Sequence, residues 1–172
     1  MLAETAFLRG QLPGLLTRLG VRRLLDAPCG DFNWMNEVPL DDIQYIGCDS
    51  SMENIQAAYR RADRDFREMD IITDDLPPAD AMLCRDFYQH LPHRMVFSAL
   101  RNFIASGIPW LLATTHDNQV NDDIPKASMF RRLNMGIAPF SFPKPTILIP
   151  DPPGSGHYLG VWSRDEVIHA IC

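Results

Sequence analysis

The sequence predicts an α/β protein built on a doubly wound, mostly parallel sheet that ends in an antiparallel hairpin. Short apolar segments of strand type alternate with helical segments, an alternation typical of parallel sheets. The first four expected strands also end in or beside an acidic residue. The carboxyl ends of parallel strands form the ligand-binding edge of such sheets, so the acids indicate a binding site there. The length of 172 residues fits one domain, residues 1–172.

We expect a helical segment within residues 1–19, because leucines recur there on one helical face: Leu8, Leu12, Leu15, Leu16 and Leu19. Proline is tolerated in the first turn of a helix better than in its middle. The regular helix is therefore expected to run from Pro13 to Leu19 and to end at Gly20.

The expected strands cover residues 22–27, 45–48, 65–69, 79–84 and 110–114. A helix capped by Ser50 or Ser51 is expected to run through Tyr59, and another from Pro92 to Ile104.

Residues 116–145 break this alternation, and we expect an irregular lid or substrate-binding segment there. Residues 146–149 and 158–162 are expected to form the terminal hairpin, followed by a short helix over residues 164–171.

Composition narrows the function classes. The net charge of −6 argues against a nucleic-acid partner, because phosphate binding needs a basic surface. No apolar run approaches the ~20 residues that span a bilayer, and no secretory signal is recognisable. The four cysteines lack metal-ligand spacing, which fits a reduced cytoplasmic protein.

The acids at the strand ends suggest a nucleoside ligand. Asp49 follows Asp26 by about the 20 residues that separate the first strand from the ribose-binding acid of dinucleotide folds. Asp70 is placed to accept a hydrogen bond from an adenine amino group, with Ile71 packing beside the ring. Each acid also has a structural reading: Asp49 as a helix cap, Asp70 as turn chemistry and Asp26 as an acceptor for loop amides.

The loop after the first strand discriminates between cofactors. Dinucleotide loops use several glycines to approach a pyrophosphate, but this loop contains only Gly30. Pro28 lacks an N–H, and Phe32 adds bulk. A cofactor without pyrophosphate, such as S-adenosylmethionine (SAM), fits better than a nicotinamide dinucleotide.

At this point the sequence resembles the class I SAM-dependent methyltransferases. "LLDAPCGDFNWM" is similar to their first motif, "YIGCDSS" to the second-strand acid motif, "REMDI" to the third and "ADAMLCRDFYQHL" to the fourth, while "PWLLATTH" is similar to their fifth strand. The Asp-Ala-Pro-Cys-Gly-Asp loop is similar to that of a group of small, largely uncharacterised members. The resemblance covers roughly residues 20 to 163 and implies a Rossmann-like sheet of seven strands with the last one antiparallel.

The resemblance also implies residue roles. It places Asp26 and Gly30 in the cofactor loop, with Asp49 at the ribose hydroxyls, Asp70 at the adenine amino group and Arg85 beside the methionine moiety. Three neighbours complete the expected cofactor-binding set: Pro28, Ser50 and Ile71.

We expect methyl transfer to a small molecule, with an oxygen nucleophile such as a sugar or metabolite hydroxyl favoured. A hydroxyl acceptor is helped by a general base, for which His90 and His116 are candidates, and Asp86 is expected to touch cofactor or substrate. His90 is alternatively a helix cap, and His157 is expected at the periphery. We predict no metal site. The alternatives are a non-catalytic methyltransferase-like binding module and a nicotinamide-dependent oxidoreductase.

Overall fold

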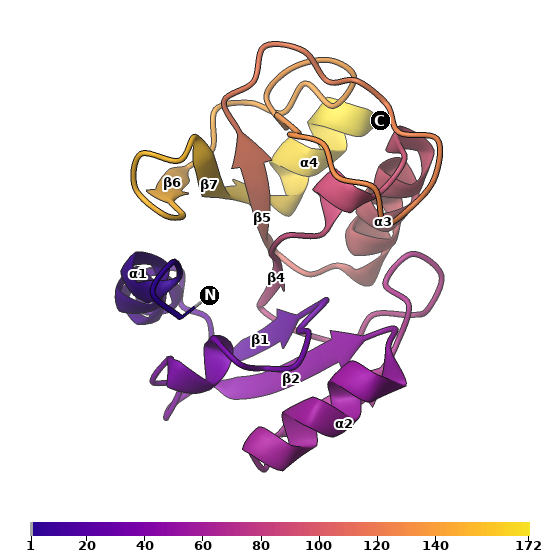
Figure 1. Ribbon diagram of the computed structural model, residues 1–172. Coiled ribbons are helices and arrows are strands. Elements are labelled where there is room, and N and C mark those ends of the chain that lie inside the picture. The colour runs from indigo at the N-terminus through magenta and orange to yellow at the C-terminus, as the bar shows by residue number, and fades with distance from the viewer. Residues whose placement is uncertain (1) are drawn as a thin grey trace.

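The computed structural model describes residues 2–172 and confirms the expected fold class (Figure 1). Seven strands form one sheet in the order β3-β2-β1-β4-β5-β7-β6, and among the described strands β7 alone runs in the direction opposite to the other six. The strands are β1 (Arg23–Asp26), β2 (Gln44–Asp49), β3 (Asp65–Glu68), β4 (Ala81–Cys84), β5 (Trp110–His116), β6 (Ile147–Pro150) and β7 (His157–Ser163).

The strand order reverses between β1 and β4. The chain first builds outward from β1 through β2 to β3, and then returns to the other side of β1 with β4 and β5. Ligands of open α/β sheets bind outside the carboxyl ends of the strands at such a reversal. The fold therefore directs attention to the residues that follow β1, β2 and β4.

Four α-helices cover the two faces of the sheet: α1 (Ala6–Arg18), α2 (Met52–Arg61), α3 (His93–Ser106) and α4 (Arg164–Ile171). Side chains of α1 and α2 share one buried cluster, and those of α3 and α4 share the other. Ser51 caps α2 by accepting a hydrogen bond from the backbone of Asn54. Within residues 2–172, no helix is both long and apolar enough to cross a membrane.

The expected start of α1 at Pro13 is wrong, because the helix begins at Ala6 and contains Pro13. An interior proline costs a helix about 3 kcal/mol. Four leucines of α1 are almost completely buried, and burying each contributes roughly 1.5–3 kcal/mol, which outweighs that cost. These leucines are Leu8, Leu12, Leu15 and Leu16.

Residues 117–146 contain no helix or strand, as expected for most of this segment. Its predicted first residue, His116, belongs instead to β5, because β7 pairs with β5 as far as His116 and His157. The segment arches over the carboxyl end of β5 (orange in Figure 1) and returns beside it, where the backbone N–H of His116 donates to the carbonyl of Leu133.

Candidate functional site

The loop between β1 and the short 3-10 helix at Met35–Glu37 approaches the end of β2. The backbone N–H of Gly30 donates to Asp49 Oδ2 at 3.0 Å. Gly30 has φ +57°, and a Cβ built on it would meet nothing within 4 Å. The glycine therefore serves both a left-handed backbone conformation and an open space in front of the loop.

Asp49 ends β2 and is almost fully buried. Besides Gly30, its carboxylate accepts from the backbone of Ser51 at 2.8 Å and from Asn54 Nδ2 at 3.2 Å, both on Oδ1. A carboxylate offers about four acceptor positions, so one position on Oδ2 remains for a ligand hydroxyl. Asp49 thus links the loop to the start of α2 and keeps one acceptor position unoccupied.

Phe32 and Pro28, which stand in this loop where a glycine-rich loop would have smaller residues, differ in how deeply they are buried. Phe32 is buried and packs its ring against Tyr45 at 5.0 Å and Phe66 at 5.1 Å, so its bulk points into the core. Pro28 is only partly buried and precedes Cys29, whose N–H donates to the carbonyl of Cys48.

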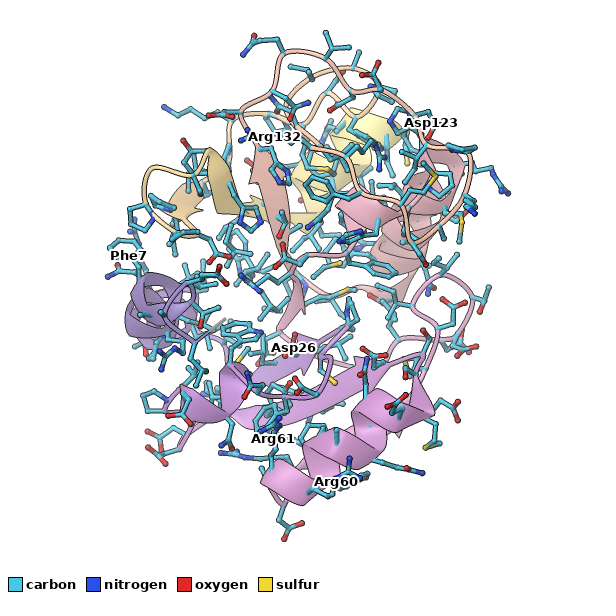
Figure 2. The ribbon with its side chains drawn as sticks, viewed as in Figure 1. Phe7, Asp26, Arg60, Arg61, Asp123 and Arg132 are labelled. Carbon is cyan, nitrogen blue, oxygen red and sulfur yellow. The ribbon has the colours of Figure 1, made fainter. Side chains whose placement is uncertain are left out.

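Asp26 ends β1 and is buried below this loop, where Tyr45 Oη donates to its Oδ2 at 2.6 Å (Figure 2). Burial raises the pKa of Asp26 to about 7, against the hydrogen bond from Tyr45 and the positive charge of Arg85, which lower it. The carboxyl group is therefore poised between its two forms near neutral pH.

This pKa predicts how stability depends on pH. Because the pKa of Asp26 is about 7 in the folded chain and 3.8 by default, the folded state holds the extra proton between these values. The stability that Asp26 contributes is then present near pH 4 and lost as the pH rises toward 7.

Asp26→Asn mimics the protonated form and removes this dependence. We expect the unfolding free energy of the wild type to fall relative to the variant between pH 4 and pH 7 and to level off above, measured by urea unfolding at a series of pH values. Parallel pH curves for the two proteins contradict this assignment.

A cavity of about 470 Å³, the Asp70 cavity, opens beyond β2 and β3. Asp70 Oδ1 accepts from the backbone of Ile72 at 2.9 Å, which fixes a tight turn. Ile72 lines the cavity, whereas the expected Ile71 is buried in the core behind it. The lining residues are Ser50, Asp70, Ile72, Phe87, His90, Leu91, Met95, Ala127 and Ser128.

Arg85 follows β4 and sits between two carboxylates. Its Nη1 lies 2.7 Å from Asp86 Oδ2, and its Nε lies 2.7 Å from Oδ2 of the buried Asp151. The guanidinium also stacks over the ring of Trp34, with its Cζ 5.1 Å from the centroid. Arg85 therefore links the β1 loop, the end of β4 and the residue that follows β6.

A second cavity, the Asp86 cavity, measures about 340 Å³ and lies beside the ends of β4 and β5. His116 lines this cavity, while His90 lines the Asp70 cavity, so the two candidate bases do not share one cavity. Both rings contact Phe130, with centroids 5.6 Å apart for His90 and 6.3 Å for His116. The lining residues are Asp86, Gln89, His116, Phe130, Arg132, Ser155 and His157.

Asp86 is held by donors on both oxygens. Gln89 Nε2 lies 2.8 Å and His157 Nε2 lies 3.0 Å from Oδ1, while Arg85 occupies Oδ2. Burial favours the neutral acid, but the hydrogen bond from His157 and the charge of Arg85 outweigh it and lower the pKa of Asp86 to about 2. Asp86 is therefore a permanent carboxylate.

His157 and Asp151 are site residues that the sequence reasoning missed. The expectation that His157 is peripheral is wrong, since its ring is mostly buried between Asp86 and the backbone carbonyl of Asp151. Burial lowers the pKa of His157, but the two aspartates outweigh this and raise it. The predicted hairpin could have indicated both residues. A strand that runs antiparallel to β5 begins beside the end of β5, and this places His157 next to His116.

His116 is tied to the returning segment. The backbone N–H of Leu133 donates to His116 Nδ1 at 3.2 Å, and the Leu133 carbonyl already accepts from the backbone N–H of His116. Burial lowers the pKa of His116, which keeps its ring neutral near pH 7.

Within residues 2–172, no cluster of three or more His, Cys, Asp or Glu side chains has an arrangement that could hold a metal ion.

No protein-family model and no curated protein matches the sequence. Solved structures do match. A protein from Pyrococcus horikoshii aligns with a TM-score of 0.63 and 15% identity, over 89% of this chain and 87% of its own. Human N-acetylserotonin methyltransferase, solved in complex with SAM, aligns with a TM-score of 0.60 and 14% identity, over 85% of this chain.

Magnesium protoporphyrin IX methyltransferase from Synechocystis, solved with bound S-adenosylhomocysteine (SAH), aligns with a TM-score of 0.57 and 13% identity, over 68% of this chain. The present chain spans 58% of that protein and about half of the human enzyme, 48%. At these identities the likeness concerns the fold, and this protein has the Rossmann-like fold of the SAM-dependent methyltransferases.

Proposed function

We propose that this protein transfers a methyl group from SAM to an oxygen nucleophile of a small molecule. One observation carries the proposal: at the strand-order reversal, the carboxylate of Asp49 holds the N–H of Gly30 and keeps an acceptor position beside the open space at that glycine. A nucleoside without phosphates fits such a site, because it needs one hydroxyl acceptor and one close approach of the backbone.

The Asp70 cavity and the residues next to it fit the remainder of this cofactor. Asp49 and Ser50 would hold the ribose, Asp70 the adenine amino group, and Ile72 the face of the ring, with Ile71 packed behind it. A volume of about 470 Å³ is in the range of small-molecule sites.

The other expected cofactor residues surround the loop. Pro28 and Gly30 would border the cofactor along the loop. Asp26, held by Tyr45, would support the loop from the end of β1. Arg85, fixed by two aspartates and by Trp34, would lie near the amino-acid end. In this proposal these residues bind and orient the cofactor.

When bound, SAM supplies an electrophilic methyl group on a sulfonium. The chain must then place the acceptor in line with that group and exclude water. Asp86 and His116 line the cavity next to the end of β4, where we propose that the acceptor binds, and His90 lies on the cofactor side of Phe130.

We further propose a cytoplasmic protein with a small-molecule substrate rather than nucleic acid. The net charge of −6 opposes phosphate backbones, and all four cysteines are free. The Asp86 cavity, about 340 Å³, suits a compact acceptor.

Calorimetry with SAM, SAH and NAD tests the proposal. We expect SAM and SAH to bind and NAD not to bind. Binding of NAD without binding of the sulfur compounds contradicts the proposal in favour of an oxidoreductase. Binding of SAM without methyl transfer to any of a broad metabolite panel favours the non-catalytic binding module.

A further inference from the structure

We propose that the acceptor presents a carboxylate to the Asp86 cavity and leaves as a methyl ester. This inference rests on the proposed function and narrows its oxygen nucleophile to one that arrives ionised. It follows from the hydrogen-bonding state of Asp86, Gln89, His116, Arg132 and His157, which line the cavity, because together they offer donors and no free base.

Asp86 is not available to take a proton. Its carboxylate is contacted by Gln89 and His157 on Oδ1 and by Arg85 on Oδ2, and these contacts favour the ionised form. A carboxylate stabilised in this way is a weak base, because protonation would sacrifice its ion pairs. The carbonyl oxygen of Gln89 has no partner among residues 2–172, but it is covered from the cavity and offers no accessible acceptor.

His157 is held as a cation. Its Nδ1 contacts the backbone carbonyl of Asp151, which can only accept, so Nδ1 carries a hydrogen. Its Nε2 lies 3.0 Å from the Asp86 carboxylate, which also only accepts. Both ring nitrogens therefore bear hydrogens, and the ring has no lone pair with which to act as a base.

His116 faces the cavity as a donor. His116 Nδ1 lies 3.2 Å from both the backbone nitrogen and the carbonyl oxygen of Leu133. The carbonyl already accepts from the backbone N–H of His116, whereas the buried N–H of Leu133 has His116 Nδ1 as its only acceptor within residues 2–172. A buried N–H needs a partner, so the network assigns the lone pair to Nδ1 and the hydrogen to Nε2. The other ring nitrogen, Nε2, thus presents N–H to a ligand in the cavity.

Arg132 supplies a second donor set and a positive charge at the mouth of the cavity, beside the end of β5 (Figure 2). Its Nη2 pairs with Asp117 at 2.9 Å and with the carbonyls of Ser155 and Gly156. All of its hydrogen bonds within residues 2–172 are made by Nη2, which leaves Nε and Nη1 for a ligand. A guanidinium with two free donor groups matches a carboxylate better than a neutral hydroxyl.

His90 does not change this conclusion, because it lines the Asp70 cavity and meets the Asp86 cavity through the ring of Phe130. A hydroxyl acceptor would need a base that this cavity lacks, whereas a carboxyl group, with a pKa of about 4, is already ionised at neutral pH. In the transfer, a carboxylate oxygen forms a bond to the methyl carbon, the carbon–sulfur bond breaks, and its electron pair stays on sulfur. No proton moves.

Two measurements test the inference on the full chain. The first is calorimetry of benzoate, benzyl alcohol and benzylamine in the presence of saturating SAH, chosen because the exposed ring of Phe130 suits an aromatic probe. We expect benzoate to bind at least tenfold more tightly than the alcohol or the amine. Arg132→Gln should weaken benzoate about tenfold or more and leave the alcohol unchanged.

The matched control is Arg60→Gln, which removes the same charge from the exposed surface of α2 (Figure 2) and should keep benzoate binding at the wild-type value. Benzoate that binds no better than benzyl alcohol, or that is indifferent to Arg132→Gln, overturns the proposal.

The second measurement follows a tritiated methyl group from SAM onto a panel of carboxylic acids and their matching alcohols and amines. Methyl esters release labelled methanol in mild alkali, whereas ethers and methylamines do not. Alkali-labile label on acids supports the proposal. Alkali-stable label on alcohols or amines, or no transfer to any acid by protein that binds SAM, overturns it. Failure to bind SAM at all is a separate result and refutes the proposed function instead.

Discussion

Replacing Asp49 with alanine is expected to weaken SAM binding by about 2–4 kcal/mol, or roughly thirty-fold to a thousand-fold. The variant loses the carboxylate position proposed for a ribose hydroxyl. It also frees the N–H of Gly30, which Asp49 holds at 3.0 Å, so the loop no longer stays in the shape that approaches the ligand. Titration calorimetry of SAM at pH 7.5 measures the change.

Two companion variants separate the causes. Asp49→Asn keeps one carbonyl acceptor and the side-chain volume, and we expect an intermediate loss of affinity. Asp42→Ala removes an exposed carboxylate before β2 and should leave the affinity unchanged. Urea unfolding of each variant checks that the chain is folded. An Asp49→Ala protein that is folded and binds SAM with wild-type affinity removes Asp49 from the proposed ribose contact.

The acids at the strand ends could be predicted because their placement is a local property. Each lies next to a short apolar strand, and a parallel sheet brings all its carboxyl ends to one edge. Asp26, Asp49, Asp70 and Asp86 accordingly follow or end β1, β2, β3 and β4. The loop between β1 and β2 indicated the class of cofactor for the same reason. It contains one glycine, and glycine marks a place where the backbone can come close to a ligand.

Other features depend on contacts between distant segments. Asp151 and Arg85 are 66 residues apart, and no local pattern connects them. Whether Ile71 or Ile72 faces the Asp70 cavity depends on the turn that Asp70 makes with its own side chain. The start of α1 depends on how deeply its leucines pack, which a local rule for Pro13 cannot include. For Arg85, Asp151 and the start of α1, tertiary packing decided between local alternatives, whereas for Ile71 and Ile72 the local turn did.

The donor character of the Asp86 cavity belongs to this second group. The residue types alone suggested a base, since histidine is the commonest one. We propose that their partners make them donors: Leu133 takes the lone pair of His116, and Asp86 keeps His157 charged. A histidine becomes a base or a donor according to the group that meets its other nitrogen.

Asp151→Ala is expected to lower the free energy of unfolding by about 3–5 kcal/mol. Asp151 is 1% exposed, and its Oδ2 accepts from Arg85 Nε at 2.7 Å. Arg85 is itself mostly buried, so the change leaves a charged N–H without its partner in a place that water reaches poorly. Urea unfolding at pH 7.5 measures the loss as a lower midpoint with an unchanged slope.

The control is the ion pair between Asp65 and Arg67, whose side chains are 40% and 45% exposed. Asp65→Ala should cost no more than about 1 kcal/mol, because water replaces the lost partner there. Equal losses for the two variants would show that burial of Asp151 is not the cause.

A double variant sharpens the argument. Arg85→Met removes the buried charge that Asp151→Ala strands, so the combined variant should be more stable than the sum of the two single losses predicts. Additive losses would mean that Arg85 and Asp151 stabilise the fold independently. A large coupling free energy would instead show that Asp151, which follows β6, fixes the guanidinium of Arg85. The same guanidinium pairs with Asp86 and favours its ionised form. The antiparallel hairpin would then contribute to the chemistry of the site as well as to the edge of the sheet.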